Sequence, residues 1–400
     1  MMSSRTLELA AALVLFSLVG CGDDGASSGG GGAGGAGPTP CTADEIADCR
    51  VNQKACSLVD GAAECKACDP GQYVLAEDGS CAPLEGTVFS HDFEDFTVGP
   101  GEEVLGLCQS WTLGNETELW VNAVELTQDE QSHHSNWTFV PDDKFNGPDG
   151  VWTCADRDYD QLSAALAGGV IYAQSTQSVH EVQKFPSGAA VRIPPHARII
   201  GDVHLLNTTA NEVTGHASLS LYTLDKSAVE VSLAPFHLTY DTLDIPPHAS
   251  SRFSGTCDLA DNWATAVGGS VALTLYYGLP HTHKLGTRFF LEAVGGPRDG
   301  EVLLDVRGFN GEARGTYYEP PVDLSGITGL KFGCEFENPR DEAVHWGFGD
   351  QEMCEMLGFI AAPVAFESRI SEVVPDGSDG DMPLFTGACG TLMIPWEGKL

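Results

Sequence analysis

Short alternating or apolar runs, separated by turn-forming residues, dominate the chain from about residue 89 to its end. Examples are Ala217–Leu224, Val271–Leu279, Arg288–Val294, Glu301–Phe309 and Leu330–Phe336. Runs of this kind, bounded by Gly, Pro, Asn or Asp, are typical of β-strands in antiparallel sheets. Long amphipathic helical patterns are missing, and only Gln161–Leu166 favours a short helix. The pattern predicts an all-β chain with two antiparallel, jelly-roll-like β-sandwiches.

The composition agrees with a turn-rich β protein and argues against a nucleic-acid partner. The 400 residues include 47 glycines and 22 prolines, and charged residues make up 19%. Because 57 acidic side chains stand against 20 basic ones, the formal net charge is -37. Nucleic-acid binding requires a basic patch, and none is present. We therefore expect no nucleic acid among the partners, and we attribute the acidic surface to solubility.

The first 40 residues have the features of an export signal followed by a tether. A basic residue, Arg5, precedes the apolar run Leu9–Val19 in residues 1–20. Leu18-Val19-Gly20-Cys21 resembles the lipobox of bacterial lipoproteins, which implies cleavage before Cys21 and lipid attachment to its thiol. An ordinary signal with an incidental cysteine is the alternative. Residues 21–40, rich in Gly and Ala, predict a flexible tether. We expect an exported protein held by a lipid anchor on the membrane of the bacterial cell envelope, in the periplasm or at the cell surface.

A small cysteine-rich module is predicted for residues 41–84. Its six cysteines are Cys41, Cys49, Cys56, Cys65, Cys68 and Cys81. Apolar residues are sparse, so disulfides rather than a core would hold it together. It resembles the EGF-like modules, although Cys65-x-x-Cys68 is one residue wider than their usual spacing, and the pairing stays open. A zinc site competes weakly, because the segment lacks His. We expect the module to bind a protein or glycan partner.

Two stretches in the first predicted sandwich carry candidate metal ligands. Ser132-His133-His134-Ser135 contains two adjacent histidines. Adjacent residues point to opposite faces of a regular strand, so both could ligate one metal only at a bulge or a strand end. The other stretch, Gly201–Asn207, places His204 in an apolar strand, where a lone histidine is usually a core residue.

Two further stretches lie in the second predicted sandwich. His281 and His283 follow an apolar strand, and residues i and i+2 of a strand share one face. Imidazole suits copper, zinc, iron and nickel. Glu352-Met353-Cys354 adds a thioether, a soft ligand that favours Cu(I).

In this order, and with these neighbours, the four stretches resemble the copper type II, ascorbate-dependent monooxygenases. This family includes dopamine β-monooxygenase and the peptidylglycine α-hydroxylating enzyme. The resemblance covers roughly residues 89–395 and is strongest at His-Thr-His-x-x-Gly, His281–Gly286, and at Glu-Met-Cys, Glu352–Cys354. The strand pattern places the end of the first sandwich near Leu233, so we expect an N-terminal sandwich over residues 85–233 and a C-terminal sandwich over residues 234–400, and the resemblance implies one copper in each.

The resemblance also implies ligands, disulfides and an activity. It assigns the first copper to His133, His134 and His204, and the second, catalytic copper to His281, His283 and Met353. It implies the disulfides Cys108–Cys154, Cys257–Cys389 and Cys334–Cys354. The expected activity is hydroxylation of an activated C–H bond of a small organic substrate with O2. Ascorbate or another small reductant would be the co-substrate, and the two coppers would face each other across a solvent-filled cleft.

Several positions depart from the family pattern. Ser135 stands where the family usually has Met. Leu279 replaces the Arg with which peptide-amidating members hold a carboxylate, and Glu355 and Leu357 replace polar residues after the Met-Cys pair. These departures argue against a peptide carboxylate as substrate. Glu355 either favours a cationic amine or is an exposed glutamate with no role, and we expect the latter.

The sequence is also compatible with two non-enzymatic functions. A copper-binding or surface interaction lipoprotein would keep the fold and the metal without turnover. A purely structural β-sandwich adhesin would bind no copper, and its histidines would lie far apart.

Overall fold

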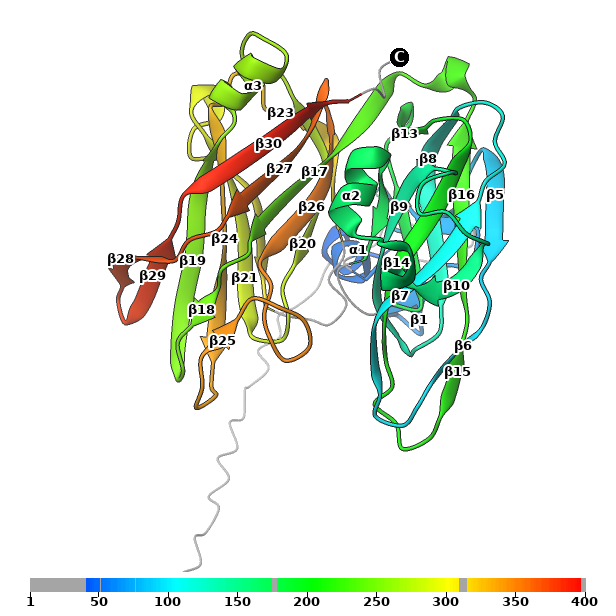
Figure 1. The fold of residues 1–400 in the computed structure, drawn as a ribbon, viewed down its shortest axis with the longest axis horizontal. Coiled ribbons are helices and arrows are strands. Elements are labelled where there is room, and N and C mark those ends of the chain that lie inside the picture. The colour runs from blue at the N-terminus through cyan, green and yellow to red at the C-terminus, as the bar shows by residue number, and fades with distance from the viewer. Residues whose placement is uncertain (1–40, 51, 76, 175–177, 309–314, 397–400) are drawn as a thin grey trace, which may run out of the picture. The chain divides into compact units, whose positions relative to one another are not determined.

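The computed structural model describes residues 41–50, 52–75, 77–174, 178–308 and 315–396 (Figure 1). The predicted signal peptide, lipidation site Cys21 and tether lie outside these residues. Strands dominate the described part, so the all-β prediction with two sandwiches and a disulfide-rich module is confirmed. The helices of the described part are short, and none is long and apolar enough to span a membrane.

Two sheets make up the first sandwich. The order of one sheet is β10 (Gly150–Thr153), β7 (Glu103–Thr112), β14 (Ala197–Leu206), β9 (Ser132–Pro141), β11 (Gly169–Ala173). The order of the other is β13 (Ala189–Ile193), β8 (Leu119–Gln128), β16 (Ala217–Leu224), β5 (Thr87–Asp92), with β12 (His180–Lys184) paired to β8. A separate pair joins β6 (Phe96–Val98) to β15 (Val213–Gly215). Phe93 packs on Trp137 with ring centroids 4.9 Å apart in the shared core.

The second sandwich has the same two-sheet construction. One sheet runs β22 (Val302–Arg307), β21 (Gly286–Val294), β24 (Gly329–Asn338), β19 (Ala249–Asp258), β29 (Met382–Thr386), β28 (Val374–Asp379). The other runs β23 (Thr316–Asp323), β20 (Thr274–His281), β26 (Glu355–Ala361), β17 (Val231–Tyr240), followed by β27 (Val364–Ile370) and β30 (Cys389–Pro395). A short pair joins β18 (Asp244–Ile245) to β25 (Val344–His345). Tyr240 of β17 packs on Phe253 of β19, with ring centroids 5.7 Å apart.

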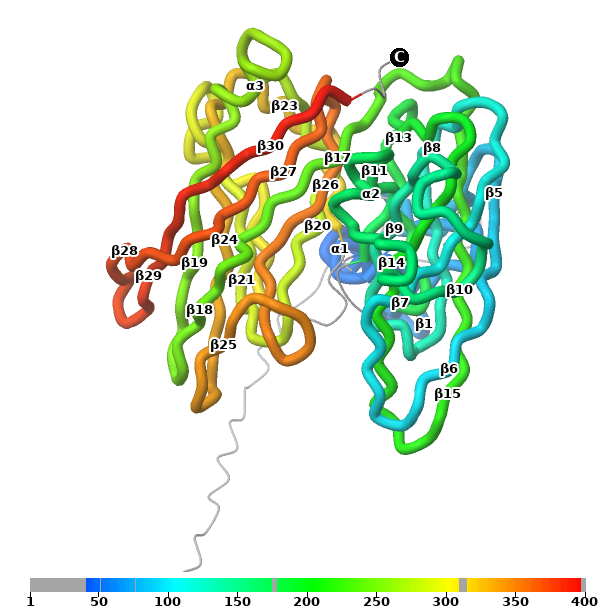
Figure 2. The backbone as a smooth tube through the Cα atoms, viewed as in Figure 1, coloured from blue at the N-terminus to red at the C-terminus, as the bar shows by residue number. Residues whose placement is uncertain are grey.

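Strand β17 belongs to both halves. Its first residues pair in parallel with β13, and from Leu233 onward it pairs with β26. Figure 2 shows the chain of β17 leaving the first group of strands and running beside β26 and β27. The predicted boundary between residues 233 and 234 therefore falls inside one continuous strand. The two sandwiches share this strand and a common hydrophobic core.

The element predictions agree well with the structure. The helix predicted at Gln161–Leu166 is α2 (Gln161–Ala167), whose N-cap residue Asp160 accepts a hydrogen bond from the Ser163 N–H. The run Ala217–Leu224 is β16, with the predicted bounds. The four other predicted runs overlap β20, β21, β22 and β24.

The cysteine-rich module is held by three disulfides. They are Cys41–Cys56, Cys49–Cys65 and Cys68–Cys81. They fasten α1 (Ala43–Arg50) to the hairpin of β1 (Lys54–Val59) and β2 (Ala62–Ala67), and close the pair of β3 (Gln72–Val74) and β4 (Cys81–Pro83). All six thiols are consumed, so the alternative of a zinc site in this segment is excluded.

A buried carboxylate fixes the module to the first sandwich. Glu125 of β8 accepts hydrogen bonds from the Gly71 N–H at 2.7 Å, from His180 at 2.8 Å and from the Tyr222 hydroxyl at 2.8 Å. Burial raises the pKa of Glu125, but these hydrogen bonds outweigh it and leave the pKa below its ordinary value. The hydrogen bond from the Gly71 N–H to Glu125 therefore fixes the position of the module on the first sandwich.

We predict an acid-sensitive contribution to stability from Glu118. Its carboxylate accepts hydrogen bonds from Lys226 and Arg192, and these lower its pKa from 4.5 to about 2. Because the folded-state pKa is the lower one, the contribution is complete above pH 4.5 and is lost as the pH falls toward 2. The stability difference between the native protein and Glu118→Gln should shrink over this window, measured by denaturant unfolding. Exposed Glu116→Gln is the matched control, and a pH-independent Glu118→Gln difference would contradict the assignment.

Candidate metal centre

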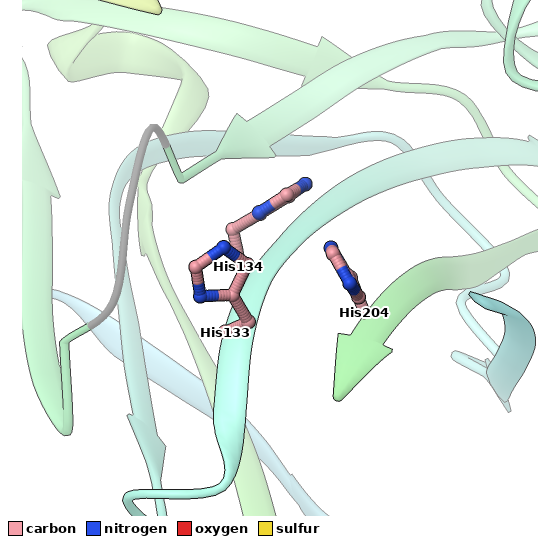
Figure 3. A group of neighbouring side chains, drawn as sticks. All are labelled: His133, His134 and His204. Carbon is pink, nitrogen blue, oxygen red and sulfur yellow. The ribbon is translucent and has the colours of Figure 1, made fainter. Parts of the chain in front are cut away.

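Three histidines from neighbouring strands face one another in the first sandwich. His204 of β14 lies directly opposite His134 of β9, and the pairing register shifts at the next position, where Leu205 lies opposite Ser132. His133 is thus the extra residue of a β-bulge, which turns it toward its neighbours. Ring centroids lie 4.7 Å apart for His134 and His204, 4.8 Å for His133 and His204, and 5.1 Å for His133 and His134 (Figure 3). The bulge anticipated from the sequence is what brings adjacent histidines together.

The unpaired nitrogen atoms of this cluster fit a metal ion. The Nδ1 atoms of His133, His134 and His204 are buried and have no hydrogen-bond partner. One potential ligand atom from each residue lies within 4.8 Å of the others. A buried polar atom without a partner is costly, and a metal ion would satisfy all three at once.

A carboxylate selects the tautomer of one ligand. Glu103 of β7 lies 2.8 Å from Nε2 of His204. Because an ionised carboxylate only accepts, Nε2–H donates and Nδ1 keeps its lone pair for the cluster. Carboxylates that orient metal-binding histidines in this way raise their basicity. Glu103 carries no signal in the sequence, because 101 residues separate it from His204 and no local motif connects them.

Burial keeps His133 and His134 neutral. It lowers the pKa of His133 to about 4, with further lowering by His204 and His283. Burial, and then the neighbouring imidazoles, hold the pKa of His134 well below its ordinary value. Neutral imidazole is the form that binds metal, so no proton needs to leave at neutral pH.

Ser135, one of the departures from the family pattern, points elsewhere. It is buried and its hydroxyl accepts a hydrogen bond of 2.8 Å from the Trp137 indole. Gly201 on β14 lets this indole approach, because a Cβ at Gly201 would lie 2.7 Å from the ring. Ser135 therefore supports the packing of β9 behind the histidines.

His281 and His283 lie close together, but not on one strand. His281 is the last residue of β20, whereas His283 lies in the following turn, where the Gly286 N–H donates to the His283 carbonyl. The expectation that strand alternation pairs them is wrong, because this turn takes the backbone out of the sheet. Their ring centroids are nevertheless 5.0 Å apart. His283 Nδ1 lies 2.8 Å from the Gln351 carbonyl, which only accepts, so Nε2 is left as the potential ligand.

Glu352 joins the turn that contains His283 to the segment that contains Met353, through hydrogen bonds. It is 1% exposed, and its two carboxylate oxygens accept hydrogen bonds from the His283 N–H at 2.8 Å and the Leu285 N–H at 2.6 Å. Burial raises the pKa of Glu352 to about 7, although these backbone hydrogen bonds oppose the shift. The adjacent Cys354 is joined to Cys334 of β24 by a disulfide. Both links hold Met353 in position beside the histidine turn.

Met353 and histidines of both sets line one cavity. Its volume is about 650 Å³, and its lining includes His134, His204, His281 and Met353. Met353 is 5% exposed and lies outside the main hydrophobic cluster of the described residues. The structure thus places the methionine on the same cavity as His281.

Most of the cavity wall is apolar. Leu162 and Leu166 of α2 lie on one side, Leu392 and Ile394 of β30 on another, and Phe348 lies in the segment before Met353. Leu162, Leu166, Leu392 and Phe348 are all more than 40% exposed, although they are large and apolar. The cavity therefore offers an open, apolar surface next to the histidines.

One polar group in the cavity wall is Glu355, for which the sequence predicts exposure and no role. It is half-buried, directly opposite His281 in the β20–β26 register, and hydrogen-bonded to Thr239 and Trp346 at 3.2 Å. His237 lies 3.6 Å away. Burial raises the pKa of Glu355, but His237 and the nearby His281 outweigh it and lower it to about 2. The expectation of an exposed glutamate is wrong, because β17 and β26 enclose the side chain.

The two sets of ligands lie next to each other. The ring centroids of His134 and His281 are 5.5 Å apart, which is ring contact. The two sets therefore meet at these two rings, beside the cavity of about 650 Å³ that histidines of both sets line. The physical reason is that the two sandwiches share β17 and a continuous core, in which Phe185 packs on Phe359 with centroids 5.0 Å apart.

The cysteines near both sets form disulfides. Cys108–Cys154 ties β7 to the segment after β10 on the first sandwich. Cys334–Cys354 and Cys257–Cys389 lie in the second. These are the three pairs that the resemblance implies.

Comparisons with known proteins give distant structural similarity only. No protein-family model matches the chain, and no curated protein matches it. Among solved structures, the major capsid protein P2 of bacteriophage PM2 is similar at 7% identity and a TM-score of 0.32, over 67% of this chain and 97% of that one. The structure of Sulfolobus Turreted Icosahedral Virus is similar at 8% identity and a TM-score of 0.29, over 70% and 92%. Similarity at this level carries no argument about function.

We predict that Glu103 controls the metal affinity of the first histidine cluster. In Glu103→Ala, His204 loses the acceptor that fixes its tautomer, so Cu(II) affinity at this cluster should fall about 10–100-fold. Competition with a chelator of known affinity measures the change. Glu116→Ala, at an exposed position of the same sandwich, is the control and should bind as the native protein does. Equal affinity in Glu103→Ala would show that the carboxylate does not orient the ligand.

Proposed function

We propose that this chain is a copper- and reductant-dependent monooxygenase that hydroxylates an activated C–H bond of a small organic substrate. The observation that carries the proposal is the set of three buried, unpartnered Nδ1 atoms, beside a second pair of histidines and a cavity-lining methionine. The order of these residues along the chain resembles that in the copper type II, ascorbate-dependent monooxygenases. Two coppers per chain follow from the two ligand sets.

The donor types suit copper in two different roles. Nδ1 atoms of His133, His134 and His204 would hold one ion. His281, His283 through Nε2, and Met353 would hold the other, and the soft thioether favours Cu(I). Copper supplies one-electron redox chemistry and reactivity toward O2 when it is bound.

The protein residues would orient the metal ligands and bind the substrate. Glu103 and Glu352 orient the two histidine sets through the hydrogen bonds described above. The cavity of about 650 Å³ falls within the range of about 300–1,000 Å³ that is usual for small-molecule sites. Its apolar walls suit a largely apolar substrate, and Leu279 provides no cation at the position where peptide-amidating enzymes carry an Arg.

The stoichiometry of the proposed reaction determines which co-substrates the protein requires. Substrate R–H, O2, two electrons and two protons give R–OH and water. The two electrons come from a small reductant such as ascorbate, which is oxidised. Export belongs to the same proposal, because the chain has six disulfides and disulfides form and persist in an oxidising compartment. Lipid attachment through Cys21 is also part of the proposal, and it rests on the resemblance to the lipobox.

Copper counting and oxygen uptake test the proposal in two steps. Purified metal-free protein is loaded with Cu(II), freed of excess, and analysed for copper per chain; two are expected. O2 uptake is then followed with ascorbate and a panel of apolar compounds, and should require both copper and reductant. Fewer than two tightly bound coppers would overturn the proposal. Two coppers without turnover would favour the alternative, a copper-binding or surface interaction lipoprotein.

A further inference from the structure

We propose that the cavity beside the histidines takes a neutral substrate with a long aliphatic tail, and that the tail lies on a rim of exposed apolar side chains at the mouth of this cavity. The inference rests on the proposed function, because it names the substrate class of the same site. The apolar rim consists of Leu105, Leu162, Leu166, Phe348 and Leu392, all of which line the cavity.

The exposure of the apolar rim is the observation that carries the inference. Its five side chains are 44–52% exposed, although they are large and apolar. The other large apolar side chains that are exposed, within the part of the chain that the structure describes, are valines outside this cavity wall. Scattered exposed valines are ordinary, whereas leucines and a phenylalanine gathered at one opening mark a binding surface for an apolar group.

The rim residues come from four separate parts of the chain. Leu105 belongs to β7, Leu392 to β30, and Phe348 to the segment between β25 and β26. Leu162 and Leu166 are four residues apart on α2, so they lie on one face of this helix. Four elements that meet at one opening form a concave surface, and concave apolar surfaces hold small molecules.

The apolar wall continues from the rim into the protein. Phe236, Leu279 and Phe366 line the same cavity and are at most 5% exposed, and Phe236 stacks on Phe366 with ring centroids 5.2 Å apart. Because His281 and Met353 lie in this wall too, a tail on the apolar surface keeps the activated C–H bond at the head of the substrate next to the proposed copper ligands. A membrane surface or a flat protein partner would cover the rim without reaching the buried phenylalanines, so the depth of the apolar wall favours a tail.

The charged side chains of the wall favour a neutral substrate, because they already have partners. They are Asp202, Asp241, Glu355, Glu367 and Arg369. Arg369 pairs with Asp241 at 3.1 Å and with Glu367 at 2.7 Å. Asp202 accepts a hydrogen bond of 2.9 Å from Gln161, and Glu355 has the hydrogen bonds described above. A charged substrate would have to compete with these contacts, whereas a neutral tail leaves them intact.

Calorimetric titration of the metal-free protein with primary alcohols tests the inference. Hexanol, octanol and decanol are neutral, carry an activated C–H bond next to the oxygen, and differ in tail length alone. The dissociation constant should fall about fourfold for each added methylene, because burial of one CH₂ contributes about 0.8 kcal/mol. Since no copper is present, the measurement does not depend on turnover.

Variants of the rim distinguish the tail site from non-specific binding. Leu162→Gln with Leu166→Gln should weaken decanol binding about tenfold and leave hexanol binding within about twofold, because the shorter tail stays inside the cavity. Leu392→Gln, on another side of the cavity, is a second and independent variant with the same expected effect. Val302 of β22 is 50% exposed and lies outside the cavity wall, so Val302→Gln is the matched control and should bind every alcohol as the native protein does.

The outcomes separate this inference from the proposed function. A dissociation constant that does not depend on tail length would overturn the inference, as would an equal loss for hexanol and decanol in the rim variants or a similar loss in Val302→Gln. Dimers of the native protein that the rim variants dissociate, measured by sedimentation velocity, would assign the rim to a second copy and overturn the inference. Length-dependent binding by a protein that holds fewer than two coppers would overturn the monooxygenase proposal and leave the tail site standing as a ligand site.

Discussion

Met353→Leu should reduce reductant-dependent O2 uptake to the level of the copper-free protein. Leucine keeps the volume and apolar character of methionine, and such exchanges usually cost less than about 1.5 kcal/mol of stability. The variant therefore removes the thioether but leaves the fold. Because a soft sulfur ligand favours Cu(I), its loss should shift the second copper toward Cu(II) and stop its reaction with O2. Oxygen uptake with ascorbate, together with the copper content, measures the effect.

Met356→Leu is the matched control. Met356 is fully buried three positions further along, in β26, and is absent from the lining of the cavity. The same chemical change there should leave O2 uptake and copper content close to the native values. Equal uptake in Met353→Leu and the native protein would show that the sulfur takes no part. Equal losses in both variants would show that repacking, rather than ligation, causes the effect.

Removal of Cys257–Cys389 should cause the largest loss of stability among the disulfides. It closes a loop of 132 residues and joins β19 of one sheet to β30 of the other. In the loop-entropy treatment, a loop of this length stabilises the fold by ~5 kcal/mol. Cys257→Ala with Cys389→Ala should therefore lower the free energy of unfolding by up to this amount, measured by denaturant unfolding without reductant. β30, which among the described strands pairs with β27 alone and carries cavity-lining Leu392 and Ile394, should loosen first.

The double variant Cys68→Ala with Cys81→Ala provides the comparison. Its loop has a sequence separation of 13 residues and lies within the module, so the same treatment gives ~3 kcal/mol. The loss should be confined to the module, with the unfolding of the sandwiches unchanged. An unaltered unfolding midpoint after removal of Cys257–Cys389 would show that sheet packing alone holds β30.

The strands were predictable because their signal is local. Alternation over a few residues, bounded by glycine and proline, gave β16 its bounds and marked β20, β21, β22 and β24. Where a strand ends at a turn, the alternation of residues can continue past the end of the strand and predict a wrong strand boundary. His281 and His283 keep a strand-like spacing, yet His283 lies beyond the strand because Glu352 binds the backbone N–H of the turn from 69 residues away.

The histidines of the cluster could be predicted from the sequence, but the residues that orient them could not. His133, His134 and His204 stand out as ligand types in a recognisable order. Glu103 and His237 do not, because each is an ordinary residue of a strand. Only the register of β14 between β7 and β9 brings Glu103 to His204, and only the β17–β26 pairing brings His237 to Glu355. These contacts depend on pairings between distant segments.

The amino-acid sequence by itself determined the all-β class, the cysteine-rich module and the candidate metal-ligating side chains, since periodicity and side-chain chemistry are properties of short segments. Tertiary structure alone decided the β-bulge that turns His133 inward, the enclosure of Glu355, and the ring contact between His134 and His281. These features arise where strands far apart in sequence share a register and a core. Such an arrangement minimises the free energy of the whole chain rather than of any one segment.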